Sequence, residues 1–438
     1  MVSSSSPPPP PRGAGLVPPG GLAPLPATAP TGLPAHLELQ RTRMVCGPDV
    51  NLHTSSSLAS HQYLGVAPGA AFDLARFRAG LRIDVASLTR TDMTFHLRGA
   101  SPAIANALRR AMIAETPTMA IENVFVVSNT SVIPDEVLSH RLGLVPLAAD
   151  CRRFDYRGAE EAPSERNTIV FRLRARCTRA PDGTVVGDRV YSRQLEWLPN
   201  GSEMPEETGC RFVVPQQEHP EGAREGADGA APGTAPGAAP LGSSSPPPPA
   251  CALGPVHGDI LLARLRPGQE IDVEVHAVKG VGEDHAKFSP VSTAWYRLMP
   301  EVVLLRDVRG EEARELARLL PGLVTLTDDD GNDVPIPDGG EDGDDDASPT
   351  PLPSSVRAAV ATDVLAYDAL LERVRRLSGE PAWRDVLQLR KIKDHFIFTI
   401  ESTGAWKPQD IFRFAVAVLQ SKCDKVLEGL ATFPQRSY

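Results

Sequence analysis

Three low-complexity segments decide which parts of this chain can fold around a core. Residues 1–71 are rich in Pro, Ser and Gly, residues 216–250 form a Gly-, Ala- and Pro-rich insertion, and residues 327–355 combine an acidic run with Pro and Ser. Such segments bury too little apolar surface to offset the conformational entropy that ordering removes. We therefore predict disorder in all three and expect the remaining residues to build the core.

The net charge of −10 comes from one of these segments. Ten acidic residues and no Lys or Arg lie between Asp328 and Asp346, so the rest of the chain has 45 acidic and 45 basic residues. A free nucleic-acid-binding module, whose affinity would fall steeply with salt, is expected to be basic overall. The balanced remainder does not favour that function. We expect the acidic run to be a solvated loop, although it could mimic nucleic acid toward a basic partner.

The cysteines and the hydropathy pattern restrict the class of protein further. Six cysteines are scattered without a CxxC pair or a His cluster, which argues against a structural zinc site or a redox motif. Sparse cysteines fit a reducing compartment. No run of 18 apolar residues is present, and the first residues lack the apolar core of a secretory signal. We expect a soluble intracellular protein.

Strand-like and helical patterns alternate outside the low-complexity segments. Apolar residues alternate in a way that predicts strands over 81–98, 119–133, 167–179, 189–197, 259–280, 294–305 and 394–404, with a turn at 266–268. Apolar residues recur at helical spacing over 101–115, 134–143 and 407–430. Pro102 suits the first position of the first helix, and Gly143 suits the end of the second.

The stretch DEVLSHRLGLVPL, residues 135–147, raises the question of catalysis. Glu136 and His140 are four residues apart and share a helix face. A general base also needs an oriented imidazole and a substrate site, and the patterns GxSxG and HExxH are absent. We favour a structural helix whose Leu138 and Leu142 face a core. A hydrolase that uses His140 stays as an alternative, which predicts activity that His140→Ala abolishes.

Two polar stretches are candidate binding surfaces. VKGVGEDHAKFSP, residues 278–290, contains a Gly-x-Gly but not the pattern of a phosphate loop. We interpret it as a loop whose His285 and Lys287 contact another subunit, with an ordinary charged turn as the alternative. Arg109 and Arg110 lie beside the apolar stripe of helix 101–115, where arginines are either solvated or interface anchors.

The last helix carries more apolar surface than one packing seam needs. The side chains spaced four and three apart are Phe412, Val416, Leu419, Cys423, Val426 and Leu430, and a second row is Ile411, Ala415 and Val418. One surface could pack on the helix's own domain while another meets a partner. A deeply buried core helix is the alternative, and the pattern alone favours neither.

The sequence ANALRRAMIAETPTMAIENVFVVSNTSVIPDEVLSHRLGLVPL, residues 105–147, closely resembles the signature of the larger alpha-like subunit of cellular RNA polymerases. The hallmarks are the NALRR helix, the T-S-V strand end and the D-E-x-L-x-H-R-L-G-L-x-P-L helix, and the resemblance extends over 278–300 and 400–423. It looks most like the version shared by RNA polymerases I and III. The polymerase II version carries a cysteine cluster, whereas only Cys151 and Cys177 lie between 147 and 200 here. The equivalent polymerase II subunit stays the alternative.

The resemblance implies an α+β fold with two parts. A discontinuous alpha-like dimerisation domain, an antiparallel sheet with helices, would comprise 72–147, 281–326 and 356–438, and a β-rich domain would be inserted at 148–280. The chain would be a non-catalytic assembly scaffold that pairs with a smaller alpha-like subunit and nucleates the polymerase core. It would serve transcription of ribosomal RNA, 5S rRNA and tRNA in the nucleus, including the nucleolus.

The resemblance also implies partners and contact residues. Besides the smaller subunit, we expect contacts with the second-largest subunit and small zinc-binding subunits, contact with DNA only through the complex, and no membrane. No catalytic residue or cofactor is expected, since Mg²⁺ and Zn²⁺ would belong to other subunits. The dimer helices would present Ile104, Leu108, Met112, Phe412, Val416, Leu419, Cys423 and Val426. Candidates for contact with the polymerase core are Asn106, Arg109, Arg110, His140, Arg141, Lys279, His285 and Lys287.

Overall fold

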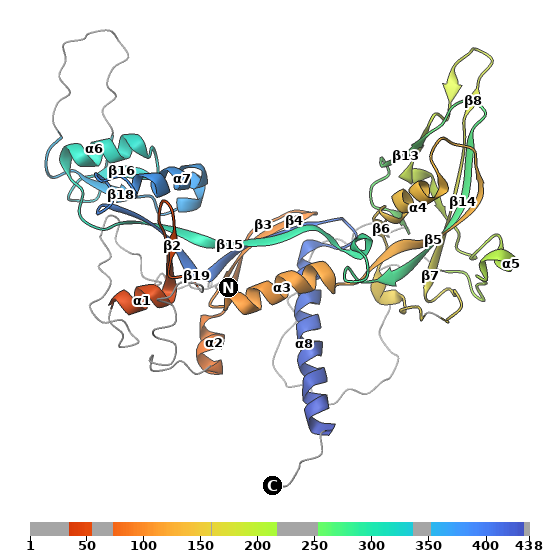
Figure 1. The fold of residues 1–438 in the computed structure, drawn as a ribbon, viewed down its shortest axis with the longest axis horizontal. Coiled ribbons are helices and arrows are strands. Elements are labelled where there is room, and N and C mark those ends of the chain that lie inside the picture. The colour runs from red at the N-terminus through yellow and green to blue at the C-terminus, as the bar shows by residue number, and fades with distance from the viewer. Residues whose placement is uncertain (1–34, 55–72, 159, 217–252, 336–351, 433–438) are drawn as a thin grey trace, which may run out of the picture. The chain divides into compact units, whose positions relative to one another are not determined.

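The computed structural model describes residues 35–54, 73–158, 160–216, 253–335 and 352–432. Helices and largely antiparallel sheets make up these ranges (Figure 1), which confirms the expected α+β class. Contacts divide the chain into two units. Unit 1 comprises Met1–Ile83, His96–Pro102 and Arg297–Ile397, and unit 2 comprises Asp84–Phe95, Ala103–Tyr296 and Phe398–Tyr438.

A six-stranded sheet has the strand order β2-β1-β19-β4-β3, with β15 paired to β19. Its strands are β1 (Arg43–Cys46), β2 (Asn51–Leu52), β3 (Arg82–Leu88), β4 (Asp92–Arg98), β15 (Val291–Leu304) and β19 (Leu387–Ser402). The unit boundaries fall inside β3, β4, β15 and β19, so each of these strands contributes residues to both units. The predicted strands at 81–98, 294–305 and 394–404 are confirmed, and β19 begins earlier, at Leu387.

Unit 1 has its own core between helices and a small sheet. The helices of this core are α6 (Gly310–Leu319) and α7 (Asp368–Leu377), with a 3-10 turn at Val364–Tyr367, whereas α1 (Ala35–Thr42) and α2 (Leu74–Gly80) have no buried residue. The sheet has the order β17-β16-β18, from Asp333–Val334, Val324–Thr327 and Arg357–Val360. Figure 1 shows α6 and α7 beside β16 and β18. Leu316, Leu323 and Trp383 are among the buried core residues.

The predicted disorder of 1–71 is wrong for residues 35–54. β1 pairs with β19 from Arg43 opposite Ile392 to Cys46 opposite Leu389, and Cys46 is buried. The Arg43 guanidinium also binds the Glu301 carboxylate at 2.8 Å. Strand pairing therefore orders a segment that composition alone assigns to a tail. The predicted disorder of 327–355 is likewise wrong at its start, because β17 pairs with β16, with Asp333 opposite Thr327 and Val334 opposite Leu326. Residues 1–34, 55–72, 217–252 and 336–351 lie outside the described residues, so the predicted disorder there stays a prediction.

The main sheet of unit 2 has the order β11-β7-β14-β5. Its strands are Leu195–Trp197, Thr168–Arg176, Glu270–Gly280 and Thr118–Asn129 in that order. Three two-stranded pairs accompany it: β6 (Leu147–Ala148) with β12 (Gly254–Pro255), β8 (Thr178–Arg179) with β9 (Val185–Val186), and β10 (Arg189–Tyr191) with β13 (Leu261–Arg264). Short helical turns lie at Cys151–Arg153, Ser192–Gln194, Pro205–Thr208 (α5) and Ala286–Phe288.

The strands of unit 2 differ from the sequence expectation in their extent and in their pairing. β13 and β14 flank the predicted turn at 266–268 but do not pair with each other, because β13 pairs with β10 and β14 lies between β7 and β5. β5 ends at Asn129, before the predicted end at 133. β5 was expected in the dimerisation domain and β14 in the inserted domain, yet they pair along ten positions in one unit. The predicted division of the chain into a discontinuous dimerisation domain and an inserted domain stays a prediction.

Three helices of unit 2 bear the predicted contact residues: α3 (Pro102–Ala114), α4 (Asp135–Gly143) and α8 (Pro408–Thr432). α3 begins at Pro102, and α4 ends at Gly143, as the sequence predicts. Acidic residues in the first turn of α4 and His140 and Arg141 in its last turn complement the helix dipole. In the described part of the chain, no helix is both long and apolar enough to cross a membrane.

Candidate functional site

The first half of α8 packs inside unit 2. Ile411 and Ala415 have no exposed surface. The Phe412 ring meets the Phe95 ring edge-on with 5.0 Å between centroids, and Phe95 stacks on Phe398 at the same distance. Phe95 and Phe398 come from β4 and β19, so this half of the helix packs on side chains of the sheet and covers part of the core.

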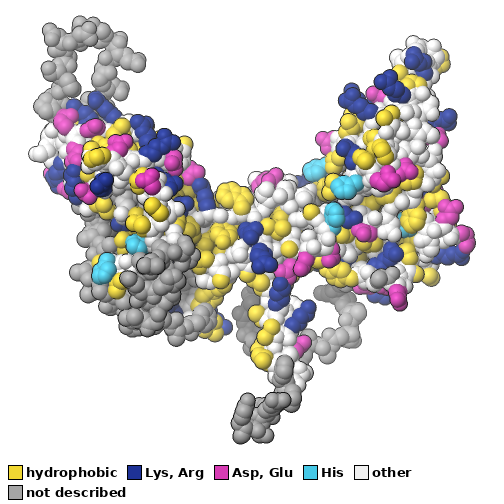
Figure 2. Space-filling model, viewed as in Figure 1, with side chains coloured by type: hydrophobic (Ala, Val, Ile, Leu, Met, Phe, Trp, Pro, Cys, Tyr) yellow, Lys and Arg dark blue, Asp and Glu magenta, His cyan; other side chains and the backbone are white. Residues whose placement is uncertain are grey.

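The second half of α8 is uncovered. Every residue from 420 to 428 is exposed, and the exposed fractions of Val426, Leu427 and Leu430 are 62%, 63% and 64%. Figure 2 shows hydrophobic side chains on this end of the helix. Aliphatic side chains that recur on one helix face in water are typical of an interaction surface. The exposed apolar row consists of Val416, Leu419, Cys423, Val426, Leu427 and Leu430.

The apolar side chains that were predicted to meet the smaller subunit from α3 are less accessible. Met112 has no exposed surface and Leu108 is 6% exposed, so both are core residues, while Ile104 is half-buried. Glu115, just after α3, forms an ion pair with Lys422 of α8 at 2.6 Å. The end of α3 therefore lies beside the start of the uncovered half of α8.

Arg109 and Arg110, two predicted contact residues on α3, differ in whether their guanidinium groups are available to a partner. The Arg109 guanidinium donates to the Asn106 side-chain oxygen at 2.9 and 3.1 Å, which fixes both side chains on the helix. Arg110 is exposed, and within the described residues it has no hydrogen bond or ion pair. Arg110 is therefore the guanidinium on α3 that a partner could take without breaking an existing contact.

Arg141 and Lys279 are engaged inside unit 2. The Arg141 guanidinium donates to the carbonyl oxygens of Leu261 and Leu262 at 2.5 and 3.0 Å, which ties α4 to β13. The Lys279 ammonium donates to the Phe154 carbonyl oxygen at 2.9 Å. Both cations hold the fold together, because breaking these bonds would leave carbonyl oxygens without their donors.

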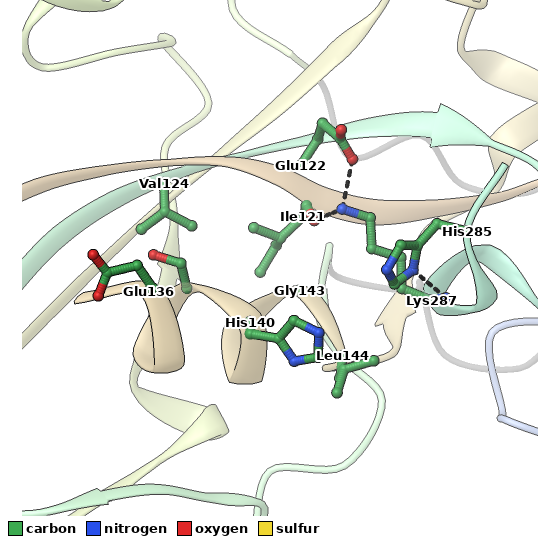
Figure 3. A pocket seen from close by; sticks show the side chains of 10 residues that line it. Ile121, Glu122, Val124, Glu136, His140, Gly143, Leu144, His285 and Lys287 are labelled. Carbon is green, nitrogen blue, oxygen red and sulfur yellow. Dashed lines mark hydrogen bonds and ion pairs between the residues drawn. The ribbon is translucent and has the colours of Figure 1, made fainter. Parts of the chain in front are cut away.

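A pocket of about 310 Å³ lies between β5, α4 and the loop before β15. Figure 3 shows Glu136 at one end and His140 near His285 at the other, with the two imidazole centroids 6.4 Å apart. The Lys287 ammonium binds the Glu122 carboxylate at 2.5 Å and donates to the Ile121 carbonyl oxygen at 2.9 Å. The structure thus brings His140, His285 and Lys287 together, which sequence reasoning treated as separate candidates.

Glycines allow the loop beside this pocket to pack closely. A Cβ on Gly282 would overlap the Ile113 carbonyl oxygen, so a glycine is needed where the loop rests on the end of α3. The Glu283 amide donates to the Ala114 carbonyl oxygen there at 2.8 Å. A Cβ on Gly280 would lie 2.7 Å from the Phe288 ring, so both glycines of the Gly-x-Gly are needed where this loop packs.

The pocket does not assemble a hydrolytic site. Ser139, His140 and Glu136 line it, but no hydrogen bond joins the three among the residues that the structure describes. A nucleophile and its general base must form a hydrogen bond with each other or have space to do so. The base also needs a third group that orients it. Because His140 and Glu136 are both exposed on the outer side of α4, the arrangement suits contact with another protein better.

A buried charge cluster in the main sheet of unit 2 escaped sequence reasoning. Glu274 and His276 have fully buried side chains joined at 2.9 Å, and Arg172, opposite Glu274 on β7, is 5% exposed. Burial acts to raise the pKa of Glu274, but hydrogen bonds from His276, Ser202 and the Glu203 amide together lower this pKa below its usual value. The alternation in DVEVH, residues 272–276, predicts that these two side chains lie on one face of the strand. It does not predict that they are buried.

Four of the cysteines, Cys46, Cys151, Cys177 and Cys210, are buried free thiols. Burial raises the pKa of Cys151 to about 12 and that of Cys210 to about 11. Burial thus favours the protonated form of these two thiols at neutral pH. Within the described ranges, no three His, Cys, Asp or Glu side chains converge in a way that could hold a metal ion.

Comparisons with known proteins fit these surfaces. Residues 94–423 match the RNA polymerase Rpb3/Rpb11 dimerisation domain. The chain is 37% identical over 407 residues to the DNA-directed RNA polymerases I and III subunit RPAC1 of Bos taurus, with 90% of this chain and 96% of that protein covered. It is 33% identical over 366 residues to the Saccharomyces cerevisiae subunit of the same name, with 81% and 88% covered. Subunit 3 of the Arabidopsis thaliana RNA polymerases II, IV and V is 28% identical over 369 residues, with 81% and 92% covered.

Proposed function

This chain belongs to the RNA polymerase Rpb3/Rpb11 dimerisation family, and we propose that it acts as the larger alpha-like subunit shared by RNA polymerases I and III. In this role it is a structural subunit and not an enzyme by itself. The observation that carries the proposal is its likeness to the polymerase I and III subunits, at 33–37% identity, against 28% for the polymerase II types. The matches are to eukaryotic polymerase subunits, which implies a nuclear location.

The family pairs a larger with a smaller alpha-like subunit, and the exposed apolar row is the surface that supports such pairing. Val426, Leu427 and Leu430 are each more than half exposed. Burying a Val or Leu side chain stabilises by about 1.5–3 kcal/mol before the costs of association. A second helix laid along this row would cover all three. We place the smaller alpha-like subunit there.

We assign a second contact surface to the pocket between α4 and β5. His140, His285 and Glu136 are exposed there, and Val137 and Leu144 are 49% and 53% exposed on the same helix or just after it. An apolar surface with imidazole and carboxylate groups suits a protein partner. We propose that the second-largest subunit or a small zinc-binding subunit covers it, and that Arg110 contacts the second-largest subunit. DNA would be reached only through the complex, and Mg²⁺ and Zn²⁺ would belong to other subunits.

Affinity purification of the tagged chain from its own cells tests the assignment. We expect mass spectrometry to identify the largest subunits of both RNA polymerase I and RNA polymerase III, together with one smaller alpha-like chain. Imaging of the tagged chain should show nucleolar as well as nucleoplasmic signal, since ribosomal RNA is made in the nucleolus. Recovery of polymerase II subunits alone would move the assignment to that enzyme, and recovery of no polymerase subunit would contradict it.

The two contact surfaces can be separated by variants in the same experiment. Val426→Asp should lose the smaller alpha-like chain, whereas His140→Ala with His285→Ala should keep that chain and lose other core subunits. Arg166→Ala, at an arginine whose side chain is 78% exposed, serves as the control for both. Loss of the smaller chain from the histidine variant would contradict the assignment of surfaces.

A further inference from the structure

A second pocket of unit 2 has a different lining. It encloses about 460 Å³ and is formed by Gly187, Asp188, Arg189, Tyr191, Arg193 and Gln194. β10 supplies Arg189 and Tyr191, and the 3-10 turn that follows supplies Arg193 and Gln194. We call these six residues the arginine pocket. Neither the dimer surface nor the pocket at His140 shares a residue with it.

Tyr191 holds one guanidinium group of the arginine pocket in place. The Arg193 guanidinium lies over the Tyr191 ring, 4.4 Å from the centroid, which is a cation–π contact. The Tyr191 amide in turn donates to the Gln194 side-chain oxygen at 2.7 Å. Side chains fixed in this way lose less entropy when they bind an anion.

Positive charge is in excess around this pocket. Residues 176–193 and 261–270 contain six arginines, two aspartates, one glutamate and no lysine, and the glutamate, Glu270, pairs with Arg176 at 3.9 Å. Arg189 lies directly opposite Arg264 in the β10–β13 pair, where like charges destabilise the pairing. In the lining, Asp188 supplies the one counter-charge, 3.7 Å from Arg189. Figure 2 shows Lys and Arg side chains gathered over the end of unit 2 that carries β8 and β13.

An exposed strand beside the arginine pocket points to a peptide. Val185 and Val186 of β9 are 43% and 56% exposed and directly precede Gly187 of the pocket. Among the strands that the structure describes, β9 pairs with β8 alone, so its other edge can accept an extended segment. Nucleic acid would use the arginines but gain little from two aliphatic side chains. A peptide would use both.

We propose that the arginine pocket and β9 bind a phosphorylated segment of a protein partner. Its phosphate binds Arg189 and Arg193 of the pocket, with Arg264 opposite Arg189 on β13 adding positive charge nearby. Its neighbouring aliphatic side chains lie on Val185 and Val186. A phosphate monoester carries a charge of about −1.5 to −2 at pH 7 and three acceptor oxygens. Guanidinium groups bind such oxygens through paired N–H donors, so these arginines fit a phosphate better than one carboxylate.

The test measures fluorescence anisotropy with the full-length chain, purified together with its smaller alpha-like partner. The probe is a labelled peptide with one phosphoserine flanked by valines, compared with the same peptide carrying serine or glutamate instead. We expect the phosphoserine form to bind at least about tenfold more tightly than either, and Arg189→Gln with Arg193→Gln to remove that difference. Arg166→Gln, an exposed arginine outside the pocket, should leave it unchanged.

Further variants keep the result interpretable. Arg264→Gln lies outside the Tyr191 contacts, so it should weaken phosphopeptide binding even if the double variant proves too unstable to purify. Arg193→Lys retains the charge but not the planar fork and should bind more weakly than the wild type. Equal binding of the serine or glutamate peptide would overturn the proposal. So would tighter binding of a labelled oligouridine at the same arginines, or an unchanged phosphopeptide affinity in both glutamine variants.

Discussion

The two halves of α8 carry the same kind of sequence and meet different surroundings. In the first half, Ile411 and Ala415 are fully buried and Phe412 packs on Phe95. In the second half, Val426 and Leu430 recur at the same spacing with more than 60% of each side chain exposed. The aromatic side chains of β4 and β19 cover only the first half. A helical apolar stripe therefore shows that something packs on it, but not whether that is its own domain or another chain.

The largest effect should come from placing charge on the exposed apolar row. Val426→Asp with Leu430→Asp would put two carboxylates where a partner helix is proposed to pack. Two buried aliphatic side chains contribute about 3–6 kcal/mol, so affinity for the smaller alpha-like subunit should fall by roughly a hundredfold or more. Titration of the partner by isothermal calorimetry measures this loss.

The same double variant sharpens the contrast between the halves because it should leave the fold intact. Both positions are exposed, so the free energy of unfolding of the chain should change little. We also expect the wild-type chain to aggregate without its partner and the double variant to aggregate less. An unchanged affinity, or a stable monodisperse wild-type monomer at micromolar concentration, would contradict the proposed role of the row.

A substitution in the first half of α8 should lower the stability of the chain and leave its affinity for the partner unchanged. Ile411→Ala removes buried methyl groups beneath α8 and should lower the free energy of unfolding by about 2–5 kcal/mol. Since Ile411 does not reach the surface, partner affinity measured on the folded fraction should stay close to that of the wild type. Chemical denaturation of the chain without its partner, at a concentration low enough to avoid aggregation, gives the first quantity, with Val426→Ala as the exposed control. Equal loss in both variants would mean that the two halves do not differ as described.

The sequence predicts elements better than environments. The strands at 81–98, the helix that begins at Pro102 and the helix 135–143 follow from alternation, a favourable first proline and a terminal glycine, which are local signals. That residues 35–54 are ordered depends instead on the pairing of β1 with β19, which is distant in sequence. Composition carries no trace of such a partner strand.

The candidate sites show the same limit. His140 and His285 could each be proposed from their own motifs, but their closeness depends on Gly282 resting on the end of α3. Met112 belongs to an apolar stripe that suits an interface, yet it is fully buried. The arginine pocket is lined by residues close together in sequence, but Arg264 comes to lie opposite Arg189 through the pairing of β10 with β13. Only long-range strand pairing determines such neighbours, so single-sequence patterns do not contain them.

A smaller effect should appear at Cys423, which lies within the exposed apolar row. It is exposed, whereas Cys46, Cys151, Cys177 and Cys210 are buried. Alkylation of this thiol by iodoacetamide should be fast in the free chain and several-fold slower in the heterodimer, because the partner helix would cover it. Mass spectrometry of the peptide containing Cys423 follows the rate, and Cys423→Ser identifies the signal. Equal rates in both states would place the partner on another face of α8.

The smallest effect should come from the ion pair at the junction between the two halves. Lys422 binds Glu115 at 2.6 Å, with the two side chains 56% and 23% exposed. Water screens such a pair, so Lys422→Ala should lower the free energy of unfolding by no more than about 1 kcal/mol, and less in high salt. The double-mutant cycle with Glu115→Ala isolates the coupling between the two charges. A coupling well above that size would mean that the pair is desolvated, and the uncovered half of α8 would then be held against α3 more firmly than its exposure indicates.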